Sequence, residues 1–440
     1  MASCSCPDHW RRTGPANPAS ALRFPVLWQP SLPEEYIRAS PAELASRITA
    51  RRLELGPSLV ILGHHYQTDD VIAHADFTGD SLKLSQLAAK AVTAQGGRFI
   101  VFCGVHFMAE TADILTPDTV AVILPDLSAG CSMADMADYD EAVAAWDALH
   151  AALKDAKWHG RVIPITYVNS SAAIKAFVGA HGGAACTSSN AQSVLSWALA
   201  GGTKPRAKGE HIKVLFLPDQ HLGRNTACRL GLDADTDTCL YDPRRTAQGE
   251  PLGGASPEQI KRASVILWAG HCSVHKLFRP EHVRAIRDAE RDIPKPDRTH
   301  VLVHPECAKE VVDLADDNGS TEYIIKRIRD AKPGSRWAVG TEVHLVSRLA
   351  KDAHARGVHV RILSDCQCLC TTMYRIDQPH LLWVLDHLAA GKVVNRITVH
   401  PKVREQALLA LDRMLELASP APDAADGEPA TGRAGHRAHA

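Results

Sequence analysis

Nine short aliphatic runs constrain the fold of this 440-residue chain more than any other feature of its sequence. Each contains four to six apolar residues without polar alternation, ends abruptly in Gly, His or another polar residue, and is followed by a stretch of helical composition. Such runs are typical of strands buried on both faces of a parallel sheet, and their alternation with helices predicts an α/β fold. The runs lie at 58–67, 98–106, 120–130, 161–171, 212–221, 264–273, 300–307, 336–344 and 358–366.

Polar and potentially reactive residues gather where these runs end. The carboxyl ends of parallel strands are where open α/β sheets and barrels build their sites. We therefore expect the functional residues of distant segments to meet at these ends. Nine runs fit three small sheets slightly better than one eight-stranded barrel.

Three cysteines stand at or near the ends of apolar runs, far apart in the chain: Cys131, Cys272 and Cys370. None belongs to the compact ligand pairs of a zinc finger. Three thiolates brought together by folding would hold an iron–sulfur cube with one iron left open to act as a Lewis acid. A zinc site completed by His271 or His275 is the alternative that the residues leave open.

The bulk composition excludes several classes of protein. The 49 basic and 50 acidic residues give a net charge of −1, so nothing predicts nucleic-acid binding. No apolar stretch approaches the roughly 20 residues that span a bilayer. The N-terminal residues lack the apolar core of a secretory signal, so we expect a cytoplasmic protein that does not bind membranes. In such a protein, twelve cysteines favour metal ligation or catalysis over disulfides.

A dozen short motifs, in order over roughly residues 55 to 415, resemble the quinolinate synthase family, the iron–sulfur enzymes of bacterial and plant NAD biosynthesis. They are GHHYQ (63–67), GDSLKLS (79–85), VFCGVHFMAETA (101–112), PDLSAGCSMADM (125–136), YVNSSAAIKA (167–176), CTSSNA (186–191), LPDQHLGRNTA (217–227), WAGHCSVH (268–275), HPEC (304–307), GSTEYI (319–324), GTEVHL (340–345) and CQCLCTTM (366–373).

The resemblance implies three pseudo-symmetric αβα sandwich domains with small parallel sheets around a central active site. On this basis we expect six segments. They are an N-terminal extension (1–50), a first domain (51–135) completed by the C-terminal segment 371–418, a second domain (136–265) with a polar insertion near 228–258, a third domain (266–370) and a disordered tail (419–440).

The resemblance also implies that each domain supplies one ligand of a [4Fe-4S] cluster, namely Cys131, Cys272 and Cys370. The family typically has C-x-x-C-x-x-C or a related pattern at the third ligand, whereas this chain has C-x-C-x-C. Cys366 and Cys368 could therefore be spectators, alternative ligands or a redox-sensitive pair, and we favour spectators or a redox pair.

Matching the motifs residue by residue implies a set of catalytic and substrate-binding side chains. His65, between two of them, is expected to point away by strand alternation and to be structural. The implied catalytic residues are Glu306, Tyr66 and His304; the implied substrate-binding residues are His64, Ser81, Tyr167, Asn169, Ser188, His275, His304, Ser320 and Thr321.

Several of these residues also have an ordinary structural explanation. Ser and Thr before a helical stretch are most often N-caps, and Glu306 could be a loop carboxylate near the start of the next helix. The resemblance favours the functional role for the set as a whole.

The implied reaction condenses iminoaspartate with dihydroxyacetone phosphate to quinolinate, phosphate and water. Because the imine is unstable, an aspartate oxidase or dehydrogenase could supply it as a transient partner. Two other classes are kept for comparison: a zinc-dependent hydrolase or lyase, and an iron–sulfur redox sensor that uses Cys366 and Cys368. The sensor has no need of the His64, Tyr66, Asn169 and Glu306 constellation.

Overall fold

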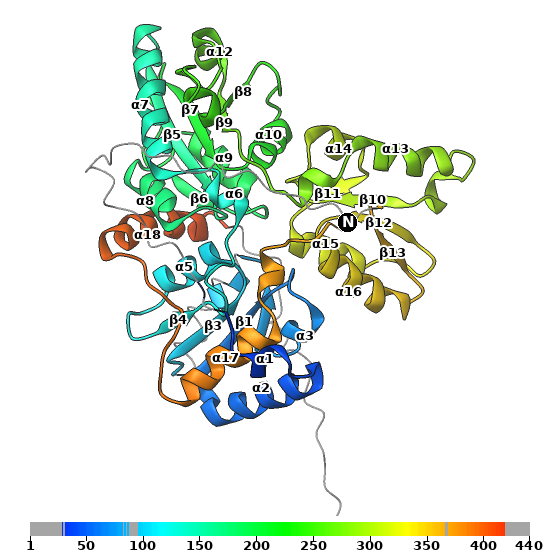
Figure 1. Ribbon diagram of the computed structural model, residues 1–440. Coiled ribbons are helices and arrows are strands. Elements are labelled where there is room, and N and C mark those ends of the chain that lie inside the picture. The colour runs from blue at the N-terminus through cyan, green and yellow to red at the C-terminus, as the bar shows by residue number, and fades with distance from the viewer. Residues whose placement is uncertain are drawn as a thin grey trace, which may run out of the picture.

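The computed structural model of the chain describes residues 29–418 apart from 30, 82, 85, 88–95, 366 and 367. It contains three small sheets, each accompanied by helices (Figure 1). All nine aliphatic runs form strands, and the predicted α/β class is confirmed. The strands form three separate sheets and not the single eight-stranded barrel that was the alternative prediction.

The first sheet combines the N-terminal part of the chain with a strand from near its C-terminus. Its strands are β1 (Leu59–His64), β2 (Phe77–Gly79), β3 (Phe99–Cys103), β4 (Ala121–Ile123) and β14 (Arg396–Ile397), in the order β14-β4-β3-β1-β2. The four N-terminal strands are parallel, and β14 pairs antiparallel to β4. The accompanying helices are α1 (Glu34–Ile37), α2 (Pro41–Leu55), α3 (Asp69–Ile72), α5 (His106–Leu115) and α17 (Gln378–Ala389).

The second sheet is parallel throughout. Its strands are β5 (Gly160–Tyr167), β6 (Ala184–Cys186), β7 (His211–Leu217), β8 (Thr238–Tyr241) and β9 (Val265–Trp268), in the order β6-β5-β7-β9-β8. The helices are α6 (Ser132–Asp135), α7 (Tyr139–Asp155), α8 (Ala172–Ala180), α9 (Ala191–Leu199), α10 (Gln220–Arg229), α11 (Pro243–Thr246) and α12 (Pro257–Arg262).

The third sheet is also parallel, in the order β11-β10-β12-β13. Its strands are β10 (His300–Val303), β11 (Asp317–Asn318), β12 (Arg336–Gly340) and β13 (His359–Ile362). Its helices are α13 (Pro280–Ala289), α14 (Lys309–Leu314), α15 (Thr321–Arg329) and α16 (Val343–His354).

Side-chain alternation along β10 explains why helices cover both faces of the third sheet. Val301 and Val303 belong to a buried cluster with residues of α13 and α14, whereas Leu302 belongs to a cluster with residues of α15 and α16. Successive strand residues point to opposite faces, so a fully apolar strand needs a cover on each side. This arrangement is the αβα sandwich.

Two segments differ in part from the expected layout. The stretch 228–258, expected as a polar insertion, contains β8, which extends the second sheet beside β9. Within 371–418, α17 packs on α2 and β14 pairs with β4, but α18 (Pro401–Glu416) packs on α8 and β6 of the second sheet. The C-terminal segment therefore contacts two sheets and not the first alone (Figure 1).

The termini lie partly outside the described residues. The expected tail at 419–440 falls there, as do residues 1–28. From the expected N-terminal extension, α1 and α2 pack against α17. No described helix combines the length and the apolar character that a membrane crossing requires.

Candidate active site

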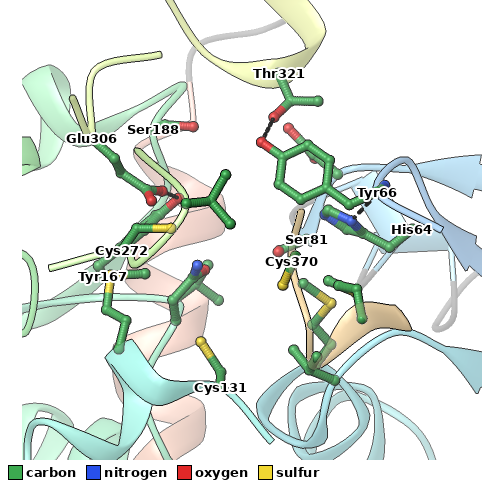
Figure 2. Close-up of a pocket in the computed structure, with 18 of the residues that line it drawn as sticks. His64, Tyr66, Ser81, Cys131, Tyr167, Ser188, Cys272, Glu306, Thr321 and Cys370 are labelled. Atoms are coloured by element: carbon green, nitrogen blue, oxygen red, sulfur yellow. Dashed lines mark hydrogen bonds between the residues drawn. The ribbon is translucent and has the colours of Figure 1, made fainter. Parts of the chain in front are cut away.

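A cavity lies where segments from the carboxyl ends of strands in all three sheets meet (Figure 2). His64 is the last residue of β1, Tyr167 is the last residue of β5, and His304 directly follows β10. Every site residue that the motifs imply, except Ser320, lines this cavity: His64, Tyr66, Ser81, Cys131, Tyr167, Asn169, Ser188, Cys272, His275, His304, Glu306, Thr321 and Cys370.

The three cysteines reach the cavity from three separate segments. Cys131 precedes α6, Cys272 follows β9, and Cys370 precedes the short 3-10 helix η5 (Met373–Arg375). Burial first, with a smaller contribution from Cys370, raises the pKa of Cys131 to about 12. Burial, then Glu306 and the two neighbouring thiols, raise the pKa of Cys272 well above its usual value. The protein alone therefore keeps these thiols neutral. A metal that binds them would have to displace their protons.

A second group of potential metal ligands consists of Cys272, His275 and Glu306, whose ligand atoms lie within 4.8 Å of one another. His275 is already engaged at both ring nitrogens. Its Nδ1 lies 2.9 Å from Oε2 of Glu306 and its Nε2 lies 3.2 Å from Oγ1 of Thr341. Metal-binding histidines commonly donate one ring N–H to a carboxylate, as His275 can to Glu306, so the zinc site completed by His271 or His275 stays an alternative at this point.

Glu306 is the most heavily contacted acid in the cavity. Tyr167 donates a hydrogen bond of 2.6 Å to its Oε1, and His275 occupies Oε2. Burial raises the pKa of Glu306, but the nearby His275 and His304 and the two hydrogen bonds outweigh burial and bring the pKa to about 2. Glu306 is therefore a buried, ionised carboxylate that lines the cavity and has its proton-accepting oxygens unprotonated.

His64 and His304 share one local geometry. In each, Nδ1 accepts a hydrogen bond from the backbone N–H two residues later, from Tyr66 at 3.1 Å and from Glu306 at 3.3 Å. Burial, the largest cause, lowers the pKa of each ring to about 3. Both rings are therefore neutral, with the proton on Nε2, and each can donate one hydrogen bond.

Tyr66 lies across the cavity from Glu306 in Figure 2. Its hydroxyl oxygen lies 3.2 Å from Oγ1 of Thr321 and 2.9 Å from Oγ1 of Thr341. Burial first, and then the negative charge of Glu306, raise the pKa of Tyr66 well above its usual value. The phenol therefore keeps its proton at every working pH and can act as a donor.

The remaining predicted residues supply neutral groups. Oδ1 of Asn169 is buried without a hydrogen-bond partner among the described residues, so it can accept a bond from a ligand. The described lining contains no Lys or Arg. Ser320 is an N-cap, whose Oγ accepts from the backbone of Tyr323, and it does not line the cavity.

His65 points out of the cavity, as its position between two site residues predicts. Its Nε2 lies 2.9 Å from Oε1 of Glu322 on α15. Arg348 of α16 donates to the backbone oxygens of His65 and Gln67. The turn that carries His64 and Tyr66 is thus tied to the third sheet.

Several lining residues escaped the motif analysis. Asp80, Phe107, Met108, Thr187 and Val168 all line the cavity. Each lies within one of the quoted motifs, and Asp80, Val168 and Thr187 directly follow a strand, whereas Phe107 and Met108 lie in the first turn of α5. Proximity to a strand end was therefore the available signal, but it does not tell a lining apolar residue from a core one.

Comparison with known proteins places the chain in a family. The family model described as "Quinolinate synthetase A protein" matches residues 47–416. Quinolinate synthase of Herpetosiphon aurantiacus is 51% identical over 386 residues, which cover 88% of this chain and 95% of that protein. The quinolinate synthase of Acidobacterium capsulatum is 49% identical over 384 residues (87% and 95%), and that of Streptomyces coelicolor is 50% identical over 379 residues (86% and 89%). This chain belongs to the quinolinate synthetase A family.

Proposed function

We propose that this chain is a quinolinate synthase that condenses iminoaspartate with dihydroxyacetone phosphate to give quinolinate, phosphate and water in NAD biosynthesis. One observation carries the proposal beyond family membership: three thiols, an ionised carboxylate and a neutral phenol from three sheets line one cavity. Imine formation, enolisation and dehydration all need positioned proton donors and acceptors.

The cysteine geometry supports a [4Fe-4S] cluster as the cofactor. Cys131, Cys272 and Cys370 are the cysteines among the described lining residues, so they offer three thiolates and no fourth. Cys368 is buried with its Sγ 3.0 Å from Oγ of Ser364 and does not line the cavity, while Cys366 lies outside the described residues. A cluster bound by three thiolates supplies one open iron as a Lewis acid for developing negative charge.

Glu306 would remove protons from the substrate. Its pKa of about 2 keeps it ionised, and Tyr167 and His275 hold its two oxygens in place. Each carboxylate oxygen can accept more than one hydrogen bond, so a substrate proton still has a site. Tyr66 would return protons to leaving oxygen atoms from the opposite side.

Neutral donors would bind the substrate anions. Nε2–H of His64 and of His304 can bind carboxylate or phosphate oxygens. Thr321 is the first residue of α15, where backbone N–H groups favour anions. With neutral donors in place of Lys or Arg, the site would hold anions mainly by hydrogen bonds, which are strong in a cavity that excludes water.

A supply of the unstable imine is part of the proposal. An aspartate oxidase or dehydrogenase could act as a transient partner that delivers it. The cytoplasmic location and the lack of a nucleic-acid partner stay predictions from the sequence.

Anaerobic purification followed by iron, sulfide and quinolinate assays tests the proposal. We expect four irons and four sulfides per chain, as the cube requires, and quinolinate from the two substrates. Zinc without sulfide would instead support the hydrolase or lyase. A cluster without quinolinate formation would support the redox sensor.

A further inference from the structure

A fully buried lysine lies directly behind one wall of the candidate active site. Lys175, on α8, has an exposed fraction of 0%. Its Nζ lies 5.4 Å from the ring centroid of Phe107, a residue that lines the cavity. Lys175 itself is not among the described lining residues, so its ammonium group is close to the cavity wall but not part of it.

The charge of Lys175 lacks an ion-pair partner in the part of the chain that the structure describes. Its recorded hydrogen bond goes to the backbone oxygen of Ser170. Glu110 is near enough to act on Lys175 electrostatically, but its Oε2 accepts a hydrogen bond from the backbone of Ala172 at 3.0 Å. A buried ammonium without a counter-charge is unfavourable, so native proteins pair such groups.

Cys131 is the other group that acts on Lys175 electrostatically, once its thiol is ionised. Burial lowers the pKa of Lys175 to about 8, while Glu110 and an ionised Cys131 raise it. In a thiolate-bound cube the three sulfurs contribute more negative charge than the iron–sulfide core contributes positive charge. Such a centre is a net anion, and it would lie in the cavity that Phe107 lines together with the three cysteines.

We infer that Lys175 is the buried counter-charge of the metal centre held by Cys131, Cys272 and Cys370. The inference rests on the proposed function, because the centre must be present for the charge to be balanced. It makes Lys175 a positioning residue, since Phe107 keeps it out of contact with substrate. The balance would raise the reduction potential of the centre and make the open iron a stronger Lewis acid.

Lys175 would also hold the loop that carries Asn169. Nζ of Lys175 donates to the backbone oxygen of Ser170. Oγ of Ser170 in turn donates to the backbone oxygen of Tyr167 at 2.9 Å and accepts a hydrogen bond from Oγ1 of Thr166 at 2.9 Å. These bonds fix the backbone between Tyr167 and Ser170. Charge and position are therefore two separable contributions of one side chain.

Lys213 offers a matched control. It is 3% exposed, donates to the backbone oxygens of Lys261 and Ala263, and lies 5.1 Å from the ring centroid of Trp158. Burial lowers its pKa to about 8 as well. It stands near the start of β7, at the end of the strand away from the site, and does not line the cavity.

The first test is redox titration of the anaerobically purified holoenzyme, followed by electron paramagnetic resonance. We expect Lys175→Gln, which keeps a donor for Ser170 but loses the charge, to lower the midpoint potential. An effect of about tenfold in the reduction equilibrium corresponds to about 59 mV for a one-electron couple. Lys213→Met is expected to leave the potential unchanged. An unchanged potential in Lys175→Gln would overturn the inference.

A second test holds even if a variant binds the cluster poorly. Melting temperatures of apo- and holoprotein are compared for wild type, Lys175→Met and Lys213→Met. We expect Lys175→Met to lose more stability in the holo form than in the apo form, because the counter-charge matters once the centre is bound. Lys213→Met is expected to lose the same amount in both. If Lys175→Met lowers the melting temperatures of the apo and holo forms equally, the role of Lys175 is contradicted. It is also contradicted if metal loading leaves the melting temperature of the wild-type protein unchanged.

Steady-state kinetics separate charge from position. Lys175→Gln is expected to lower kcat with little change in KM, whereas Lys175→Met, which also releases Ser170, is expected to raise KM as well. A wild-type protein without iron and sulfide would defeat the proposed function itself. A wild-type cluster with an unchanged potential in Lys175→Gln would defeat the inference about Lys175 alone.

Discussion

The hydroxyl of Tyr167 lies 2.6 Å from Oε1 of Glu306, and this hydrogen bond joins the end of β5 to the segment after β10. Glu306 is therefore oriented from a different sheet than the one that carries it. The other oxygen of the same carboxylate is held by His275. An acid fixed from both sides in this way can receive a proton at a defined position.

Replacing Glu306 by Gln is expected to abolish most turnover and leave the metal centre intact. The amide preserves the shape of the side chain but cannot accept a proton. We expect kcat to fall by roughly 10²- to 10⁴-fold, the usual range for a general base. Quinolinate formation and iron content are measured together. A variant that keeps its iron and turns over at the wild-type rate would remove Glu306 from the mechanism.

Changing Cys131, Cys272 or Cys370 to Ser is expected to remove iron, sulfide and the visible absorption of the anaerobically purified protein. A serine hydroxyl is a far poorer ligand for iron than a thiolate. Cys239→Ser is the control, because Cys239 is buried on the edge strand β8 and does not line the cavity. Full iron and full activity in any of the three variants would refute its assignment as a ligand.

Tyr66→Phe is expected to lower kcat by the same factor across the working pH range. Burial and Glu306 raise the pKa of Tyr66 well above its usual value, so the wild-type phenol is protonated throughout. Rate profiles of both proteins between about pH 6 and about pH 9 check this, since an ordinary Tyr titrates near 10. If the two proteins instead reach the same kcat at high pH, the wild-type hydroxyl ionises in this range and the assignment is wrong.

Glu322→Gln is expected to destabilise the protein more at neutral than at acid pH. Burial raises the pKa of Glu322, but the hydrogen bond and charge of His65 outweigh burial and lower it from 4.5 to about 2. A lowered carboxyl pKa stabilises the fold fully above the unfolded value and loses this effect as the pH falls towards 2. Melting temperatures of both proteins are compared at neutral pH and at about pH 3, which lies between the ordinary pKa of 4.5 and the lowered pKa of about 2. A difference that grows on acidification would contradict the assignment.

Gly179→Ala is expected to loosen α18 from α8. A Cβ at Gly179 would lie 1.9 Å from the backbone oxygen of Gln406, so one of the two helices would have to move. Overpacking of this kind costs typically about 1–3 kcal/mol. The control is Ala180→Ser, the exposed neighbour on the same helix. Urea titration of both variants measures the cost, and equal stabilities would show that the helix contact tolerates a methyl group.

Much of the architecture follows from local pattern. The segment 301–303 is aliphatic at successive positions and predicts a strand covered on both sides, which is what β10 is. The same argument holds for the other aliphatic runs. Because polar residues follow these strands at one end, their convergence on a cavity was also predictable.

Other features depend on tertiary contacts that the sequence does not announce. The sequence around β8 predicts a polar loop, because Asp and Thr residues flank the strand in the sequence. The segment forms a strand by pairing with β9 at the edge of the sheet. The sequence of α18 predicts an amphipathic helix but not where it packs. Its position depends on the close approach of its backbone at Gln406 to Gly179 of α8. Ser320 carries a family motif, yet its hydroxyl is used as an N-cap.

β14 completes the first sheet from almost the far end of the chain, and Cys370 comes shortly before it. During synthesis on the ribosome, β1, β3 and β4 emerge long before the strand that closes their edge. If the proposed ligand set is correct, its third cysteine is added only late in translation. Truncated chains released early would lack both this edge strand and the last thiol, which leaves them an open sheet for proteolysis or aggregation.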